Sequence, residues 1–192
     1  MWDLERKNPA LLLPGMTVHF EDVTHRPTTV TVPQQITRKA EPKQSVPLFK
    51  ITAPSLQMLI QDEGRLNQTN IGVGVAGAMD LSAMHSANRI VGNPTDTPVI
   101  EVLNGGLKAK MQHAGVIAVA GAISNIRVKF ADGQTADFAS YQPIDLDEGD
   151  EFQIQPPTAG LRNYLAVRGG IDVEPVLNSA SFDSLAVLGP EP

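Results

Sequence analysis

The chain has 192 residues, a net charge of −6 and no cysteine, which excludes disulfides, thiolate nucleophiles and cysteine-based metal sites. Its longest apolar run, from Ala114 to Ile123, is shorter than the roughly 18 residues of a membrane span. The acidic balance and few aromatic residues disfavour nucleic-acid binding, so we expect a cytoplasmic protein of about one domain, with no membrane or nucleic-acid partner.

The N-terminal residues 1–26 are interpreted as a small separate unit. An apolar run ends at a Pro14-Gly15 turn, and the alternation over Thr17–Phe20 predicts a short strand. So short a unit cannot form its own core. Residues 27–47 are rich in Pro, Thr and Gln, a composition typical of an extended linker.

Residues 48–192 are predicted to be mainly β. Short apolar or alternating runs at near-regular spacing, separated by Gly-rich turns, are typical of a barrel or a sandwich. We expect strands at 48–52, 56–60, 99–103, 107–111, 116–120 and 164–167, and two hairpin-like pairs around turns at 131–134 and 147–150.

One helix is predicted directly after Asp80, a typical N-cap. Apolar residues repeat at helical spacing from Leu81 to Val91, and Gly92 followed by Pro94 ends the repeat. A Gly-x-Gly-x-x-Gly pattern at 72–77 precedes this helix. It lacks the hydrophobic strand that a dinucleotide site needs, and Asp80 would repel a pyrophosphate. We therefore favour a loop whose glycines allow positive φ or close backbone approach.

Asp62 and Arg65 end an apolar run beside this loop. The residues alone favour a solvated turn with a surface ion pair. The functional alternative is a carboxylate that orients or deprotonates a ligand N–H, with an arginine that grips a carboxylate or phosphate.

Glu101 interrupts the apolar run at 99–103, and a buried acid needs a partner such as Arg162 or a backbone amide. Its role is either structural or catalytic. Arg162 and Tyr164 belong either to a central strand or to a cleft with anion-binding and phenolic groups. The simplest role of Asn88 is a helix-face amide, and the histidines show no metal-binding spacing.

Taken in order, these motifs resemble one family. They are Gln61-Asp62-x-Gly64-Arg65, Gly77-Ala78-Met79-Asp80, Ala87-Asn88-Arg89-Ile90-Val91-Gly92-Asn93, Glu101, Gly121-Ala122 and Arg162-x-Tyr164-Leu165-Ala166-Val167-x-Gly169-Gly170-Ile171-Asp172-Val173. Across 48–192 the set is similar to the carboxyltransferase-like subunit of the 5-oxoprolinase/urea amidolyase family, also known as KipA-like or allophanate hydrolase subunit 2. A second set, Trp2-Asp3, Pro9-Ala10-Leu11-Leu12, Pro14-Gly15 and Val18-x-Phe20, resembles the end of the KipI-like subunit 1.

The resemblance implies a cyclophilin-like β-barrel with one short helix. The chain looks like a piece of a fusion: residues 1–26 the tail of the KipI-like domain, 27–47 a linker, and 48–192 the first half of the KipA-like domain. The implied function is a component of an ATP-dependent 5-oxoprolinase, which converts 5-oxoproline to glutamate. The alternatives are the carboxyltransferase part of a urea carboxylase or a KipA-like regulatory binding module.

Under this resemblance, Asp62, Glu101 and Tyr164 are the expected catalytic residues. Substrate binding is expected of Arg65, Asp80, Asn88 and Arg162, with no metal. ATP is the implied cofactor of the complete complex, and biotin belongs only to the urea carboxylase alternative. The implied partners are the KipI-like subunit 1 domain, a LamB/YcsF-type subunit and a small amide substrate.

The sequence departs from the family pattern in three places. Asn178-Ser179-Ala180-Ser181-Phe182 stands where the family usually has Gly-Ser-x-Ser-Thr, and Ala76 stands where a small polar residue is frequent. The second half of the family's domain does not follow within the 192 residues. We therefore expect this chain alone to be inactive.

Overall fold

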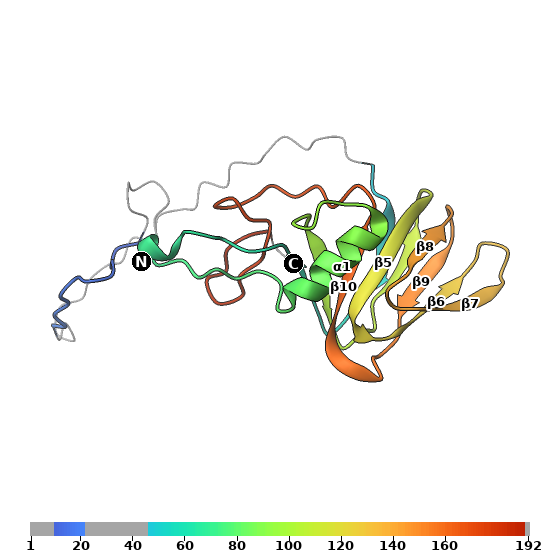
Figure 1. Cartoon of the computed structure of the whole chain (residues 1–192), viewed down its shortest axis with the longest axis horizontal. Helices are drawn as coiled ribbons and strands as arrows, with labels where there is room; N and C mark the ends of the chain where they lie inside the picture. The colour runs from blue at the N-terminus through green and yellow to red at the C-terminus, as the bar shows by residue number, and fades with distance from the viewer. Residues whose placement is uncertain (1–9, 22–45, 191–192) are drawn as a thin grey trace.

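The computed structural model describes residues 10–21 and 46–190, and Figure 1 shows their strands in two antiparallel sheets. The first five-stranded sheet has the order β1 (Phe49–Ala53), β4 (Lys108–Met111), β9 (Glu151–Ile154), β6 (Asn125–Lys129) and β7 (Thr135–Ala139). The second has the order β2 (Gln57–Gln61), β3 (Val99–Leu103), β10 (Ala159–Val167), β5 (Gly115–Ile123) and β8 (Pro143–Leu146).

The main hydrophobic core lies between the two sheets. In β6, Ile126 and Val128 are fully buried in this core, whereas Arg127 and Lys129 are exposed on the outer face. This alternation is expected of a strand with one solvated face. Residues from both sheets contribute to the core, so the large apolar area removed from water on folding stabilises their packing.

One described α-helix, α1 (Leu81–Val91), covers the other face of the second sheet, against β5 and β10 (Figure 1). Met84 of the helix packs on small side chains of the sheet such as Ala118 and Ala166. The central strand β3, most of β5 and residues 163–167 of β10 are therefore buried on both faces. This is why these stretches are mostly apolar, and why an acid within β3 is unusual.

The predicted helix is confirmed at both ends. The Asp80 side chain accepts a hydrogen bond from the backbone N–H of Ala83 at 3.0 Å, and Gly92 ends the helix with φ of 80°. The mainly β fold class is confirmed as well. However, the described strands form two sheets rather than one closed barrel.

Two strand predictions are wrong. Thr17–Phe20 is not a strand, and the Phe20 side chain is 96% exposed. The turn at 147–150 does not close a hairpin, because β8 pairs with β5 in the second sheet while β9 pairs with β4 and β6 in the first. A turn motif predicts a change of direction, but it does not tell which sheet the next strand joins.

Two long loops, residues 62–80 and 168–190, extend together away from the sheets (Figure 1). The first contains the short 3-10 helix η1 (Thr69–Ile71), and its glycines at 72 and 77 have positive φ, as predicted. Because the preceding strand β2 is antiparallel to its neighbour β3, this loop is not part of a dinucleotide-binding βαβ unit.

The predicted domain boundaries lie mostly outside the described residues. Residues 1–9 and 22–45 contain part of the proposed N-terminal unit and nearly all of the proposed linker, so both assignments stay predictions. Within the described ranges, no helix has the length and apolar character needed to cross a membrane.

Candidate functional site

A bulge in β10 forms one wall of a pocket near the start of α1. Ala159 of β10 pairs with Ile123 of β5, and the next pair along the ladder joins Asn163 to Gly121. Three residues of β10 therefore stand opposite a single residue of β5. Such bulges redirect side chains and are frequent beside functional sites.

Two glycines make this bulge possible. Gly160 has φ of 84°, and a Cβ atom there would lie 2.9 Å from the Cα of Ala122. Gly121 has φ of 98°, and a Cβ atom there would collide with the backbone oxygen of Arg162. Larger residues at either position would be strained by the positive φ and would push the two strands apart.

The pocket has a volume of about 440 Å³. Its rim is apolar, because Met79, Ile123 and Leu161 are 74%, 62% and 56% exposed. Its lining also includes three polar side chains, namely Asp80 at the N-cap of α1 and Arg162 and Tyr164 of β10. An apolar concavity with a few convergent polar groups is the usual form of a small-molecule site.

Glu101 lies behind the pocket on β3, where it is 5% exposed. Its Oε1 accepts a hydrogen bond from Arg162 Nη1 at 2.8 Å, and its Oε2 accepts one from the backbone N–H of Met79 at 2.9 Å. Both kinds of partner predicted for this acid, an arginine and a backbone amide, are therefore present. The pair holds the Arg162 side chain, which is 23% exposed, at the pocket.

Tyr164 is directly opposite Glu101 in the pairing of β10 with β3. Its ring is fully buried, and its hydroxyl accepts the backbone N–H of Asp80 at 2.7 Å. Burial raises the pKa of this phenol well above its ordinary value, and the negative charge of Glu101 raises it further. Tyr164 is consequently neutral at physiological pH.

Asp62 is the centre of a second cluster, formed with the loop that follows β10. Its carboxylate accepts four hydrogen bonds, from Ser179 Oγ at 2.6 Å, Ser181 Oγ at 2.6 Å, Gly64 N at 2.7 Å and Ala180 N at 2.6 Å. Burial alone would raise the pKa of Asp62, but these hydrogen bonds outweigh it and hold the pKa below its usual value. An ionised Asp62 therefore ties the two loops together.

Arg65 belongs to the same cluster and is fully buried. Its Nη2 donates to the backbone oxygens of Ser181 and Leu188, and its Nε and Nη1 have no partner among the described residues. Burial lowers the pKa of this guanidinium, while the charges of Asp183 and Asp62 oppose that effect. The solvated surface ion pair that the sequence favoured is therefore wrong.

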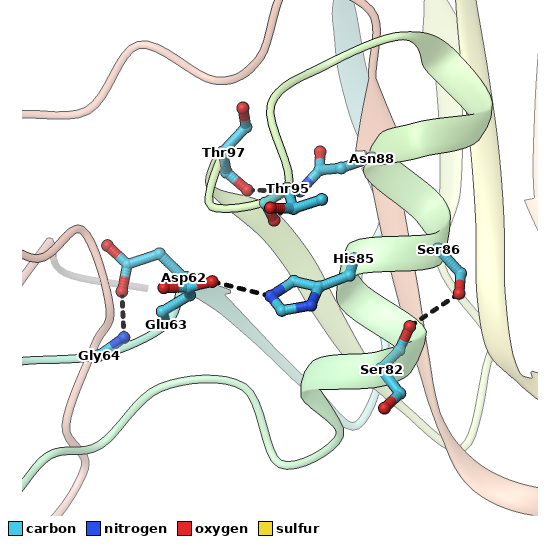
Figure 2. A network of polar contacts seen from close by, with 9 residues as sticks. All are labelled: Asp62, Glu63, Gly64, Ser82, His85, Ser86, Asn88, Thr95 and Thr97. Carbon is cyan, nitrogen blue, oxygen red and sulfur yellow. Dashed lines mark hydrogen bonds and ion pairs between the residues drawn. The ribbon is translucent and has the colours of Figure 1, made fainter.

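Asn88 lies further along α1 and is also fully buried. Its Nδ2 donates to the carbonyl oxygens of Thr95 at 3.1 Å and Thr97 at 2.8 Å (Figure 2). These bonds fix the turn between α1 and β3. The described partners of Asn88 are internal, and its predicted contact with substrate stays a prediction.

Figure 2 also shows a pair that the sequence did not suggest, between the loop after β2 and α1. His85 Nε2 lies 2.9 Å from Glu63 Oε1, and both side chains are partly exposed. Helical spacing places His85 on the side of α1 that faces the loop, but nothing in the sequence identifies Glu63 as its partner. Among residues 10–21 and 46–190, no group of three acidic or histidine side chains is arranged to hold a metal ion.

Apart from Asn88, whose bonds lie at the turn between α1 and β3, the predicted site residues fall into two groups. One group meets at the pocket: Asp80, Glu101, Arg162 and Tyr164. The other, Asp62 and Arg65, lies between the loop after β2 and the loop after β10, and is called the loop cluster below. The sequence did not predict that Ser179 and Ser181 bind Asp62, nor that Gly121 and Gly160 form a bulge, although Gly121 belongs to one of the family motifs. The Ser-x-Ser part of the family's Gly-Ser-x-Ser-Thr stretch, which this chain keeps, is the signal that could have identified the serines.

Comparisons with known proteins agree on one family. Residues 71–192 match the model described as carboxyltransferase domain, subdomain A and B. The urea amidolyase of Lachancea kluyveri is 35% identical over 142 residues, which are 73% of this chain and 8% of that protein. A 5-oxoprolinase subunit of Escherichia coli strain K12 is 32% identical over 142 residues, which are 74% of this chain and 44% of that protein.

Solved structures show the same similarity. The crystal structure of TTHA0988 superposes with a TM-score of 0.69 and 30% identity, covering 78% of this chain and 29% of that chain. The K. lactis urea amidolyase gives a TM-score of 0.64 and 36% identity, covering 70% of this chain and 8% of that chain. The chain therefore spans less than half the length of each of these relatives.

Proposed function

The chain belongs to the carboxyltransferase domain family, subdomains A and B, and from this premise we propose that it is a component of an ATP-dependent 5-oxoprolinase. The observation that carries the proposal is the pocket at the start of α1, where Arg162 is held by the buried carboxylate of Glu101 beneath an apolar rim. 5-Oxoproline has a carboxylate, apolar ring methylenes and a lactam amide. A cation beside an apolar wall suits this combination.

Arg162 is assigned to the substrate carboxylate. A guanidinium offers five N–H donors, and the hydrogen bond to Glu101 uses Nη1. The remaining donors of its planar fork can bind a second carboxylate, which an ammonium cannot do with the same geometry. Glu101 acts through Arg162 by fixing its direction and balancing its charge.

Asp80 and Tyr164 are assigned to the lactam group. Asp80 lines the pocket and is exposed, so its carboxylate can accept a hydrogen bond from the substrate N–H. Tyr164 is neutral because its pKa is raised, so its role is hydrogen bonding rather than proton abstraction. The catalytic roles predicted for Glu101 and Tyr164 are kept here as contributions to this hydrogen-bonded site.

Asp62, Arg65 and Asn88 are assigned positioning roles behind the pocket. Asp62 is connected to it through the chain, because the backbone N–H of Ala78 donates to the carbonyl of Asp62 at 2.9 Å and the next residue, Met79, binds Glu101. The loop cluster therefore anchors the segment that leads into α1. A direct catalytic role for Asp62 stays a prediction.

The start of α1 does not suit a nucleotide phosphate, because the negatively charged side chain of Asp80 caps it. Phosphate sites at a helix start need free backbone N–H groups. At α1 the N–H groups of Met79, Asp80 and Ala83 are bonded to Glu101, Tyr164 and Asp80 respectively. In the proposal ATP is therefore bound elsewhere in the complete assembly, which includes the KipI-like subunit 1 domain and the LamB/YcsF-type subunit.

The alternative function is the carboxyltransferase part of a urea carboxylase, favoured by the 35% identity to a urea amidolyase. The apolar rim formed by Met79, Ile123 and Leu161 fits the hydrocarbon part of biotin, and Arg162 fits a carboxylate carried on it. Biotin would supply the carboxyl group to urea under this alternative.

The test is an assay of the chain together with its partner subunits, on 5-oxoproline with ATP and on urea with bicarbonate, ATP and a biotin carrier. The proposal is supported if the assembly releases glutamate and Arg162→Met abolishes this activity. Arg89→Met, at an exposed position of α1, is the control and should keep the activity. Carboxylation of urea with the same dependence on Arg162 supports the alternative. Activity that Arg162→Met leaves unchanged, with the variant folded, contradicts both assignments of the pocket.

A further inference from the structure

Tyr141 is an exposed residue outside every motif described above, yet its hydroxyl makes two hydrogen bonds to the pocket wall. The hydroxyl accepts the backbone N–H of Gly121 at 3.0 Å and donates to the carbonyl oxygen of the same residue at 3.2 Å. The Tyr141 residue is 51% exposed. Gly121 is the bulge glycine of β5 that lines the pocket.

The Tyr141 hydroxyl makes the hydrogen bonds that a paired strand would make at this end of β5. β8 pairs with β5 only between residues 115 and 118, and the backbone N–H of Tyr141 adds one further bond to the carbonyl of Val119 at 2.8 Å. The edge of β5 at Gly121 lies beyond this ladder. The Tyr141 hydroxyl satisfies both backbone groups of Gly121 there, as a neighbouring strand would.

The backbone of Tyr141 is strained, with φ of 67°. This left-handed conformation suits glycine or asparagine, and it is unfavourable for a bulky aromatic residue. The turn itself therefore gives no reason for tyrosine. Strain of this kind persists where the surrounding structure holds it, and it is frequent beside functional sites.

Gly121 packs tightly against two residues of the proposed site. A Cβ atom on Gly121 would collide with the backbone oxygen of Arg162 and would lie 3.1 Å from the Tyr164 ring. There is thus no free space between Gly121 and these residues. A shift of the Gly121 backbone must move the bulge that carries Arg162.

We propose that Tyr141 is a positioning residue of the pocket, which fixes the bulge through Gly121 and thereby sets the position of Arg162. The inference deepens the proposed function, on which its kinetic consequence rests. Tyr141 touches no substrate in this proposal. Its hydroxyl acts through the backbone.

The adjacent Ser140 provides a matched control. Its hydroxyl accepts the backbone N–H of Ser124 at 3.2 Å and donates to the carbonyl oxygen of Ser124 at 2.8 Å, with a longer contact of 3.5 Å to the carbonyl oxygen of Ala122. Ser140→Ala therefore removes the same pair of bonds from the same turn without touching Gly121. Tyr141→Phe removes only the phenolic oxygen, and Tyr141→Asn removes the phenol while relieving the positive φ.

The first measurement is amide hydrogen exchange of the 192-residue chain with no ligand. Tyr141→Phe and Tyr141→Asn are expected to speed exchange at Gly121 by about tenfold or more and to shift the Arg162 side-chain resonances, because the amide loses its acceptor. Ser140→Ala is expected to leave both unchanged. Unchanged exchange and resonances in both Tyr141 variants overturn the proposal, whether or not any activity is found.

The second measurement is steady-state kinetics of the assembly on 5-oxoproline. Tyr141→Phe is expected to raise KM about tenfold with kcat within about twofold, since a displaced Arg162 weakens carboxylate binding. Equal effects of Tyr141→Phe and Ser140→Ala on KM would show a merely structural role and overturn the proposal. If the wild-type assembly has no activity but exchange at Gly121 and the Arg162 resonances respond, the proposed function fails and the positioning of Arg162 by Tyr141 stands.

Discussion

Glu101→Gln is the most direct test of the Glu101–Arg162 pair at the pocket, because it keeps the side-chain shape and removes the charge. The wild-type carboxylate accepts from both Met79 N and Arg162 Nη1. The single amide oxygen of glutamine replaces only one of these acceptors, and its NH₂ group then faces the other donor. Arg162 also loses the buried negative charge that balances it.

The magnitude follows from the burial of the two partners. Hydrogen bonds to charged groups contribute about 1.5 to 3 kcal/mol, and removing one partner of a fully buried ion pair costs about 3 to 5 kcal/mol. Because Arg162 is 23% exposed, solvent screens part of the loss. We therefore expect Glu101→Gln to lower the free energy of unfolding by about 2 to 3 kcal/mol.

The assay is urea unfolding at pH 7 in a double-mutant cycle with Arg162→Met. The two side chains should show a coupling energy of about 1 to 2 kcal/mol, and the melting temperature of Glu101→Gln should fall by about 4 to 12 °C. Glu63→Gln is the control, because the partly exposed Glu63–His85 pair should contribute at most about 1 kcal/mol. A coupling energy below about 0.5 kcal/mol would refute the account of Glu101 and Arg162 as one unit.

Three other outcomes are expected. Asp62→Asn should lower the free energy of unfolding at pH 7. Because folding lowers the pKa of Asp62, the stabilisation by its carboxylate is present above the pKa of the unfolded chain and is lost when the carboxylate is protonated. In urea unfolding, the difference in stability between Asp62→Asn and the wild type should therefore shrink as the pH falls below about 4. Gly160→Ala should lower the melting temperature more than Gly133→Ala, since both have positive φ but only Gly160 lacks space for a Cβ atom; equal losses would contradict the packing described. In Glu101→Gln, ultraviolet titration should show the pKa of Tyr164 lower than in the wild type yet still above 10.0, because burial is the larger cause of its shift.

The elements predicted well from sequence are those whose signals are local. The α1 helix has an N-cap at Asp80 and a stop at Gly92, which lie next to the residues they act on. The strand at 99–103 was predicted to the residue because β3 is apolar and bounded by turn residues. By contrast, the sheet that each strand joins depends on contacts distant in sequence, so the turn at 147–150 was misinterpreted as a hairpin.

In the site, too, the features with a local sequence signal were predicted and those that depend on distant contacts were not. Burial of Glu101 within an apolar strand predicted that it would need a partner, and that partner is Arg162. Nothing local showed that Arg65 would be buried, because the loop that covers it is more than a hundred residues away in the sequence. The bulge at Gly160 could not be predicted from sequence either, since it is defined by the register in which β10 pairs with β5.

The central claim is that Arg162 faces the substrate whereas Arg65 supports the fold, and kinetics of two equivalent substitutions test it directly. In the proposed 5-oxoprolinase assembly, Arg162→Lys should raise KM for 5-oxoproline by about tenfold or more and change the melting temperature little, because an ammonium does not reproduce the planar fork. Arg65→Lys should lower the melting temperature and leave KM within about twofold, since its contacts are buried backbone carbonyls. The reverse pattern, with KM raised by Arg65→Lys and unchanged by Arg162→Lys, would contradict the claim.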